Sequence, residues 1–352
     1  MSSDKLLFPV GTYDLIEDGI GNLGVAAMKA GYAGSQDIIF DVSSQKEEFF
    51  KTNKETLENF LDFLLNEDGC SDIPFSVDLK WNVIKKQRTQ SSVRRNNCLA
   101  LSGGLDSMAS YLRLKTKGEE SICCMFLNYQ QEQLDFETRS FLDTILEFQI
   151  NPYVVESIVF SDEEKNADHG WPFGGFKIPA RNFTILAMMN KFLDLKSRES
   201  HSLNYGVYAG EIMDKNRDKS RRFFDEATEI FSNYNGVETI VKSPVGDMSK
   251  IEQLQFLDSV GHLDFALSTA RTCVAPTEDP CMNCKPCFNR MLSVYFAGFK
   301  DRVPADQWTK LAESDIADEY SQHINDYTGV RKSDIESFLA FLADGTFNDS
   351  RG

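Results

Sequence analysis

From about residue 96 onward, short apolar runs alternate with stretches of helical periodicity. The apolar runs occupy residues 98–101, 122–127, 153–160, 203–208 and 238–241, and the helical stretches occupy residues 107–115, 131–148, 183–195 and 249–261. Continuous apolar strands that alternate with helices are typical of a parallel sheet covered on both faces. We therefore predict an α/β domain with a doubly wound parallel sheet.

The first of these strands runs into a glycine loop, Ser102-Gly103-Gly104-Leu105-Asp106-Ser107. Glycines let backbone N–H groups approach a phosphate closely, and the start of the following helix adds partial positive charge. The hydroxyls of Ser102 and Ser107 can donate hydrogen bonds to phosphate oxygens. Phosphate alone would repel Asp106, so either a Mg²⁺ bridge or a structural bond to the loop fits that residue. The loop matches neither GxxxxGK[ST] nor GxGxxG, and it predicts a different kind of phosphate site.

Half of the eight cysteines crowd into a short segment near the end of the α/β pattern. These four residues are Cys273, Cys281, Cys284 and Cys287. Cys-x-x-Cys pairs turn their sulfurs toward one tetrahedral ion, so we predict a structural Zn²⁺ site with four protein ligands. An iron–sulfur cluster also takes four thiolates, and the spacing alone does not separate the two. The scattered cysteines are expected to be small core or surface residues.

Weaker signals mark three further polar residues. Arg181 and Asn182 follow Ile178-Pro179-Ala180 just before an apolar helix. At the mouth of a parallel sheet they would hold nucleotide phosphates or ribose, although a helix-entry turn explains them equally well. Lys250 follows Ser249 in a capping box, where a cation is unfavourable beside the positive end of a helix. Pairing with a phosphate or carboxylate would explain Lys250, and so would simple solvation.

Charge and hydropathy exclude two classes of partner. The net charge of −17 argues against nucleic-acid binding, which depends on Lys and Arg neutralising phosphates. The basic cluster at residues 217–222 is interpreted as a solvated face near a phosphate-handling loop. No apolar stretch is long enough to span a bilayer, and the N-terminus lacks the pattern of a signal peptide. We therefore predict a cytoplasmic protein without a membrane partner.

Three regions are expected along the chain. Residues 1–95 are predicted to form an N-terminal α+β extension, with strands at residues 6–10, 38–42 and 75–79 and a helix at residues 55–65. The polar run at residues 85–97 is the best candidate for a linker. Residues 96–300 would form the α/β domain with the cysteine site. Residues 301–352 are predicted to be an acidic helical tail that packs on the main domain.

Taken in order, the motifs SGGLDS, IPARN and SPVGDMSKIE and the four-cysteine segment resemble the 7-cyano-7-deazaguanine synthase (QueC) family. The resemblance covers roughly residues 96–298. It implies the adenine nucleotide alpha-hydrolase-like fold of the N-type ATP pyrophosphatases, also called PP-loop enzymes. It further implies adenylylation of the carboxylate of 7-carboxy-7-deazaguanine by ATP with Mg²⁺. Ammonia would then displace AMP to give an amide, and a second ATP would drive dehydration to the nitrile.

The resemblance also assigns roles by position. Residues 102–107, Ser102, Gly103, Gly104, Leu105, Asp106 and Ser107, would form the ATP-binding loop. Arg181 and Asn182 would line the nucleotide or substrate pocket. Asp106, Ser107 and Lys250 would act in catalysis, with Lys250 neutralising charge at the reacting centre. The four cysteines would hold structural zinc, and the family tendency implies a homodimer.

The chain departs from the family pattern at residues 208–214, which read Tyr-Ala-Gly-Glu-Ile-Met-Asp. In the family this segment contacts the base, so substrate identity or the nitrile-forming step is open. Enlarged QueC-like proteins with such extensions resemble those linked to antiphage defence systems. The alternative is therefore a defence variant that conjugates the deazaguanine to an amine of a partner protein, bound through residues 1–95. Another PP-loop ligase or tRNA-modifying enzyme is a further alternative, and the intact loop argues against a retired scaffold.

Overall fold

The computed structural model describes residues 19–33, 35–65, 76–84, 94–119, 122–128, 135–157, 180–197, 200–212, 217–270, 279–345 and 347. The chain divides into two compact units. The first contains residues 1–102 and 106–247, and the second contains residues 103–105 and 248–352. The predicted strand at residues 6–10 lies outside the described residues. Within the described segments, no helix is long and apolar enough to cross a membrane.

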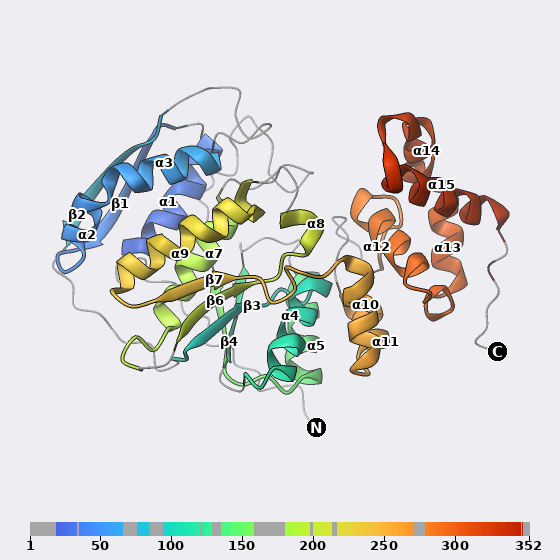
Figure 1. Ribbon diagram of the computed structural model, residues 1–352, viewed down its shortest axis with the longest axis horizontal. Helices are drawn as coiled ribbons and strands as arrows, with labels where there is room; N and C mark the ends of the chain where they lie inside the picture. Colours follow the sequence, from blue (N-terminus) through green and yellow to red (C-terminus); the bar gives the residue numbers. More distant parts are fainter. Residues whose placement is uncertain are drawn as a thin grey trace. The chain divides into compact units, whose positions relative to one another are not determined.

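The first unit is built on a five-stranded parallel sheet of order β5-β4-β3-β6-β7 (Figure 1). In chain order its strands are β3 (Asn97–Ala100), β4 (Ile122–Asn128), β5 (Tyr153–Ser157), β6 (His201–Tyr205) and β7 (Thr239–Lys242). Helices flank both faces: α4 (Leu105–Thr116) and α5 (Asp135–Glu147) lie on one, and α7 (Arg181–Met189) and α9 (Arg221–Asn235) on the other. The predicted doubly wound α/β fold is confirmed.

The strand order reverses beside β3. The chain moves outward from β3 through β4 to β5, then returns to the other side of β3 with β6 and β7. In open α/β sheets, ligands bind outside the carboxyl ends of the strands at such a reversal. The residues that follow Ala100 and Tyr205 therefore lie where this fold places a binding site.

The N-terminal residues belong to the same unit as this sheet. They form α1 (Gly19–Ala33), β1 (Asp37–Ser43), α2 (Glu47–Thr52), α3 (Lys54–Leu65) and β2 (Asp78–Ile84), and β1 pairs with β2 in a parallel two-stranded sheet. Helix α1 packs against both β1 and α7. The predicted domain boundaries at residues 95 and 300 stay predictions, because the two compact units divide the chain at other positions, near residues 102–106 and 247–248.

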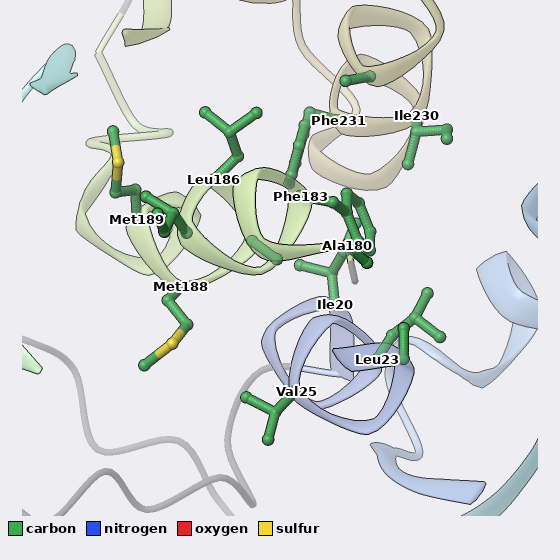
Figure 2. Close-up of a cluster of buried hydrophobic side chains, with 14 of the residues drawn as sticks. Ile20, Leu23, Val25, Ala180, Phe183, Leu186, Met188, Met189, Ile230 and Phe231 are labelled. Atoms are coloured by element: carbon green, nitrogen blue, oxygen red, sulfur yellow. The ribbon is translucent and has the colours of Figure 1, made fainter. Parts of the chain in front are cut away.

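Helix α7 is central to the core of the first unit. Figure 2 shows it between α1 and α9, with Phe183 turned toward Phe231 and Ile20 close beneath the helix. All eight residues from Asn182 to Met189 are buried. A helix that is apolar on all sides needs cover on all sides, and the sheet together with α1 and α9 provides it.

The described part of the second unit is helical. Its helices are α10 (Lys250–Ser259), α11 (Leu263–Thr269), α12 (Lys285–Phe296), α13 (Ala305–Ala312), α14 (Asp315–Gln322) and α15 (Gly329–Asp344). The predicted capping box is present, since the Ser249 hydroxyl accepts from the Glu252 N–H and the Glu252 carboxylate accepts from the Ser249 N–H. The helical character predicted for the C-terminal region is confirmed.

Some elements differ from the sequence prediction. Helices α1 and α9 were not predicted, because glycines interrupt the pattern of α1 and charged residues open α9. Six large or apolar side chains of α9 are nevertheless buried. Strand β2 continues to Ile84 and so lies later than the strand expected at residues 75–79. The alternation continues past Leu79, with Lys80 and Asn82 exposed, and it ends at Val83, which is apolar but exposed.

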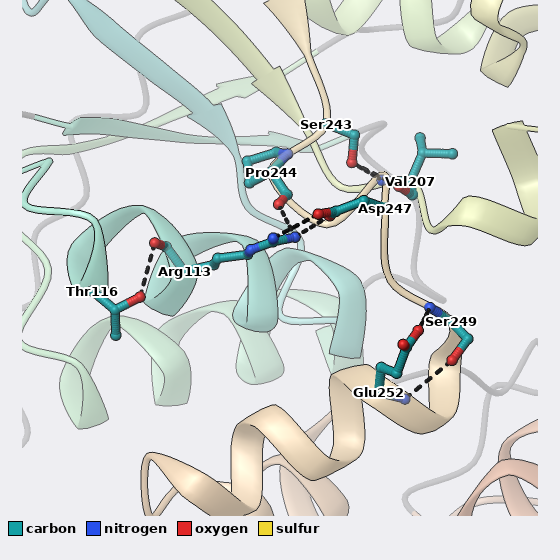
Figure 3. A network of polar contacts seen from close by, with 8 residues as sticks. All are labelled: Arg113, Thr116, Val207, Ser243, Pro244, Asp247, Ser249 and Glu252. Atoms are coloured by element: carbon teal, nitrogen blue, oxygen red, sulfur yellow. Dashed lines mark hydrogen bonds and ion pairs between the residues drawn. The ribbon is translucent and has the colours of Figure 1, made fainter.

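An ionic clamp joins the segment after β7 to helix α4. The Arg113 guanidinium donates to the Pro244 carbonyl at 2.8 Å and to the Asp247 carboxylate through both terminal nitrogens, as Figure 3 shows. The same segment is tied to the end of β6, because the Ser243 hydroxyl donates to the Val207 carbonyl at 2.6 Å. The segments that follow β6 and β7 are therefore anchored beside the reversal of strand order.

The close approach of α1 to α7 gives the first prediction. An added Cβ on Gly24 would lie 3.0 Å from Cα of Thr184 and 3.1 Å from Cβ of Ala187. Gly24→Ala should lower the free energy of unfolding by about 1–3 kcal/mol, because the two helices must separate. Urea denaturation measures the change. In an open helix the same substitution gains about 1 kcal/mol, so a more stable variant would contradict this packing.

The clamp predicts a pH dependence. The Arg113 guanidinium beside Asp247 holds the pKa of that carboxyl below its usual value. A carboxyl whose pKa is lower in the folded state contributes stability at neutral pH, and this contribution is lost as the pH falls below about 4. Asp247→Asn should therefore lower the free energy of unfolding at pH 7 by up to about 1 kcal/mol, since Asp247 is 70% exposed.

The difference between Asp247→Asn and the wild type should shrink as the pH drops through the acid range. Asp143→Asn is the matched control, because Asp143 is exposed on α5. Chemical denaturation at a series of pH values measures both variants. A loss of stability in Asp247→Asn that does not change with pH would contradict the ionic role of the clamp.

Candidate functional site

The glycine loop lies between β3 and α4, as the sequence predicts. The Ser102 N–H donates to the Ser107 hydroxyl at 3.3 Å, and the two hydroxyl oxygens lie 3.4 Å apart. Ser107 is buried, whereas Ser102 is exposed. Gly103 has a φ of +73°, in the left-handed region that favours glycine. The loop thus brings both predicted serines together at the start of a helix.

The end of β6 approaches the first turn of α4 without room for a side chain. A Cβ on Gly206 would lie 2.9 Å from the Asp106 carbonyl oxygen and 3.0 Å from the Ser110 hydroxyl. These contacts connect Asp106 to the carboxyl end of the strand beside β3. Asp106 is therefore positioned at the reversal of strand order, and Gly206 is the residue that permits it.

A polar cluster lies at the end of β6, and we call it the cluster after β6. Its members are Arg181, Tyr205, Glu211 and Lys219. Arg181, the first residue of α7, donates to the Tyr205 hydroxyl at 3.3 Å. Lys219 forms an ion pair with Glu211 at 2.8 Å, and both side chains are about one-fifth exposed. Burial of Lys219 acts to lower its pKa, because it disfavours the charged form. The interactions of Lys219 with Tyr205 and Glu211 act in the opposite direction and are stronger together, so the pKa of Lys219 is raised. The cluster therefore contains two cations, Arg181 and Lys219, and the carboxylate of Glu211.

Asn182 lies beside the same cluster and is fully buried. Its side-chain amide donates to the Asp218 carbonyl at 3.1 Å. Its carbonyl oxygen Oδ1 has no hydrogen-bond partner among the described residues. A buried acceptor without a partner costs about 1–3 kcal/mol, so a ligand N–H or O–H would be bound favourably here.

The basic cluster at residues 217–222 is held by specific contacts. Arg222 pairs with Glu226 at 2.7 Å and lies over the Phe63 ring at 4.0 Å, while Arg217 donates to the Phe63 carbonyl. Ser220 caps α9 by accepting from the Phe223 N–H. The cluster therefore joins α9 to α3, and among its cations Lys219 contributes to the polar group near β6.

Lys250 and the predicted metal ligands belong to the second unit. Lys250 is the first residue of α10, directly after the capping serine. The Sγ atoms of Cys281, Cys284 and Cys287 lie within 4.8 Å of one another. Cys273 lies outside the described residues, so the fourth ligand stays a prediction.

The segment that contains Cys281, Cys284 and Cys287, which we call the cysteine knuckle, fits a thiolate-bound ion. A tetrahedral Zn²⁺ with bonds of 2.3 Å sets its sulfurs about 3.8 Å apart, which is compatible with the observed grouping. Met282 takes a φ of +52°, and the Asn283 N–H points at Cys281 Sγ at 3.4 Å. Both features turn the chain so that the sulfurs face one point. Three thiolates suit zinc and iron–sulfur clusters alike.

The scattered cysteines that the structure describes are core residues, as predicted. Cys98, Cys123 and Cys124 are buried in β3 and β4. Burial raises the pKa of the Cys98 and Cys124 thiols well above its usual value. Such thiols stay protonated, which makes them inert packing groups.

Sequence reasoning did not single out Tyr205, Gly206, Glu211 or Lys219 as members of one site. Gly206 carries a signal that could have been used, because a glycine directly after a buried strand often marks a close approach. No sequence signal pairs Lys219 with Glu211, since seven residues separate them. Their contact joins the short helix α8 (Ala209–Ile212) to the turn at residues 217–219, just before α9.

Comparison with known proteins identifies one family. The family model described as "Queuosine biosynthesis protein QueC" matches residues 97–295, which is more than half of the 352 residues. The match begins with β3 and ends in α12, so it includes the glycine loop, the segment after β6 and the cysteine knuckle. No curated protein matches the chain closely enough to count as a relative. The chain belongs to the QueC family of ATP-using PP-loop enzymes.

Proposed function

We propose that this enzyme uses ATP to adenylylate the carboxylate of 7-carboxy-7-deazaguanine or a related deazapurine. The reaction would release pyrophosphate and pass the activated acyl group to an amine. Membership of the QueC family supports ATP use and a role related to queuosine biosynthesis. The proposal goes beyond the family role in three respects, which are the carboxylate as substrate, the acyl adenylate as intermediate and the amine as acceptor.

One observation carries the proposal. The loop of two glycines and two serines opens a helix at the reversal of strand order, where Gly206 lets the first turn of α4 approach β6. Backbone N–H groups at a helix start bind phosphate oxygens favourably. A pyrophosphate bound there would leave the α-phosphate turned toward the ends of β3 and β6. This arrangement supports attack at the α-phosphate.

The chemistry needs the residues of this loop. A carboxylate is a poor electrophile until one of its oxygens becomes part of a good leaving group. Its oxygen attacks the α-phosphorus of ATP, the bond to the β-phosphate oxygen breaks, and an acyl adenylate and pyrophosphate result. Ser102 and Ser107 would donate hydrogen bonds to the departing pyrophosphate. Bound Mg²⁺ would supply further charge neutralisation, and Asp106 is the loop carboxylate that would hold it.

The cluster after β6 suits an anionic deazapurine. Arg181 and Lys219 place two cations in this cluster, and they would attract a substrate carboxylate. The Oδ1 atom of Asn182 would accept from a ring N–H or a ribose hydroxyl. The resemblance assigns Lys250 to charge neutralisation at the reacting centre, and this role stays a prediction.

The metal at the cysteine knuckle would be structural. With Cys273 as the fourth ligand beside the three grouped cysteines, no coordination position remains for substrate. We favour zinc over an iron–sulfur cluster because the proposed reaction transfers no electrons. The site would stabilise the second unit without taking part in bond making.

Asp106→Asn gives the test of catalysis. The substitution should lower the rate of pyrophosphate release by about 100-fold or more, because the loop loses its metal-binding charge. Coupled detection of pyrophosphate with ATP and 7-carboxy-7-deazaguanine measures the rate. Asp143→Asn is the matched control and should keep the wild-type rate. Equal rates in Asp106→Asn and Asp143→Asn would contradict the proposed site.

The acceptor is identified by the mass of the product. With ATP, 7-carboxy-7-deazaguanine and ammonium, an ammonia-using enzyme yields the amide or the nitrile. The alternative is a variant that acylates an amine of a partner protein, and the altered sequence at residues 208–214 favours it. That variant yields little amide or nitrile and adds the deazaguanine acyl mass to a protein. If no AMP forms from ATP and 7-carboxy-7-deazaguanine, either with ammonium or with the partner protein, the proposed substrate is contradicted.

A further inference from the structure

The cysteine knuckle is bonded directly to the C-terminal helices. Asn283 lies between Cys281 and Cys284, and its Oδ1 atom accepts from the Ile316 N–H at 3.1 Å. Its Nδ2 atom donates to the Asp315 carboxylate at 3.2 Å. One side chain thus caps the first turn of α14 with both of its polar atoms.

Helix α14 depends on this contact for one of its terminal amides. Its own cap, Ser314, accepts from the Ala317 N–H at 3.4 Å. The Ile316 N–H donates to Asn283 of the knuckle instead. Since the first N–H groups of a helix have no partner within the helix, an acceptor from another segment fixes the position of α14.

Aromatic packing continues the contact on the other side of the knuckle. Phe288, directly after Cys287, stacks on Tyr320 of α14 with ring centroids 3.9 Å apart. The same ring meets Phe338 of α15 edge-on at 5.2 Å. Cys287 and Phe288 are almost fully buried. The helices that cover this end of the knuckle lie beyond residue 295, where the match to the QueC family ends.

The backbone turn at Met282 costs conformational free energy when no ion is bound to the knuckle. Met282 holds a left-handed conformation, which costs a residue other than glycine about 1–2 kcal/mol. Metal–sulfur bonds on both sides of Met282 would compensate for that cost. A turn fixed by an ion would present Asn283 at a constant position, and a relaxed turn would withdraw it from α14.

We propose that helices α13–α15 form a cover that Asn283 couples to metal binding at the knuckle. Metal would tighten the docking of the cover, and the docked cover would raise the affinity for metal by the same factor, because coupling between two equilibria is reciprocal. Asn283 is a positioning residue in this arrangement and not a metal ligand. The inference rests on the metal site and is independent of the substrate proposed above.

Asn283→Asp tests the coupling. The variant keeps the acceptor for the Ile316 N–H but replaces the amide donor with a negative charge facing Asp315. Competition of the full-length, zinc-loaded protein against a colour-forming chelator measures zinc affinity. The affinity should fall about ten-fold, the range found when a group that supports a metal ligand is removed. Hydrogen exchange in residues 315–322 should become faster when zinc is removed from the wild type.

Two further variants separate coupling from general damage. Asn325→Asp makes the same chemical change in the same region, at a side chain that bonds Lys332, and should leave zinc affinity unchanged. The double variant Asn283→Asp with Asp315→Asn restores a donor facing an acceptor and should recover zinc affinity.

Three results would each overturn the proposal. Asn283→Asp could hold zinc as tightly as Asn325→Asp. The double variant could stay as weak as Asn283→Asp. Hydrogen exchange in residues 315–322 could be the same with and without zinc.

Discussion

The end of β6 has no room for a side chain where it meets the first turn of α4, and the geometry of the first unit depends on this contact. Gly206 allows the Asp106 carbonyl to lie against the strand. Because β3 and β6 are neighbours in a sheet whose order reverses between them, the contact places the glycine loop at this reversal. The loops after β6 and β7 are then anchored by Ser243 and by the Arg113 clamp.

Cations lie close to this point although the chain as a whole is acidic. The net charge is −17, yet Arg181 and Lys219 both lie in the cluster after β6. Cations in an acidic protein attract small anions locally without attracting the extended backbone of a nucleic acid. The family assignment gives the use of ATP, and the acidic substrate belongs to the proposal.

Sequence periodicity predicted most of the first unit because its strands are buried on both faces and read as continuous apolar runs. The strands β3 to β7 were identified in this way, and the helical C-terminal region was also predicted. Charge concealed α9, whose first turn carries Arg221 and Arg222. Local patterns also missed Gly206, since its importance depends on a carbonyl about one hundred residues earlier in the chain.

The candidate site was only partly predictable for a related reason. Asp106 and Ser107 are adjacent in the sequence, and their loop is recognisable from its residues alone. The ion pair of Lys219 with Glu211 and the bond of Asn283 to α14 join segments that are separate in the sequence. Spacing motifs describe single turns of chain, so contacts of this kind become visible only when the fold is known.

Adenylylation of a carboxylate is the central claim, and the fate of the carboxylate oxygen tests it most directly. The enzyme would be incubated with ATP, an amine acceptor and 7-carboxy-7-deazaguanine labelled with ¹⁸O in the carboxylate. If the carboxylate oxygen attacks the α-phosphorus, mass spectrometry will find ¹⁸O in AMP, because aminolysis breaks the bond between the acyl carbon and that oxygen. Label in inorganic phosphate, formed together with ADP, would show attack at the γ-phosphate and would contradict the account.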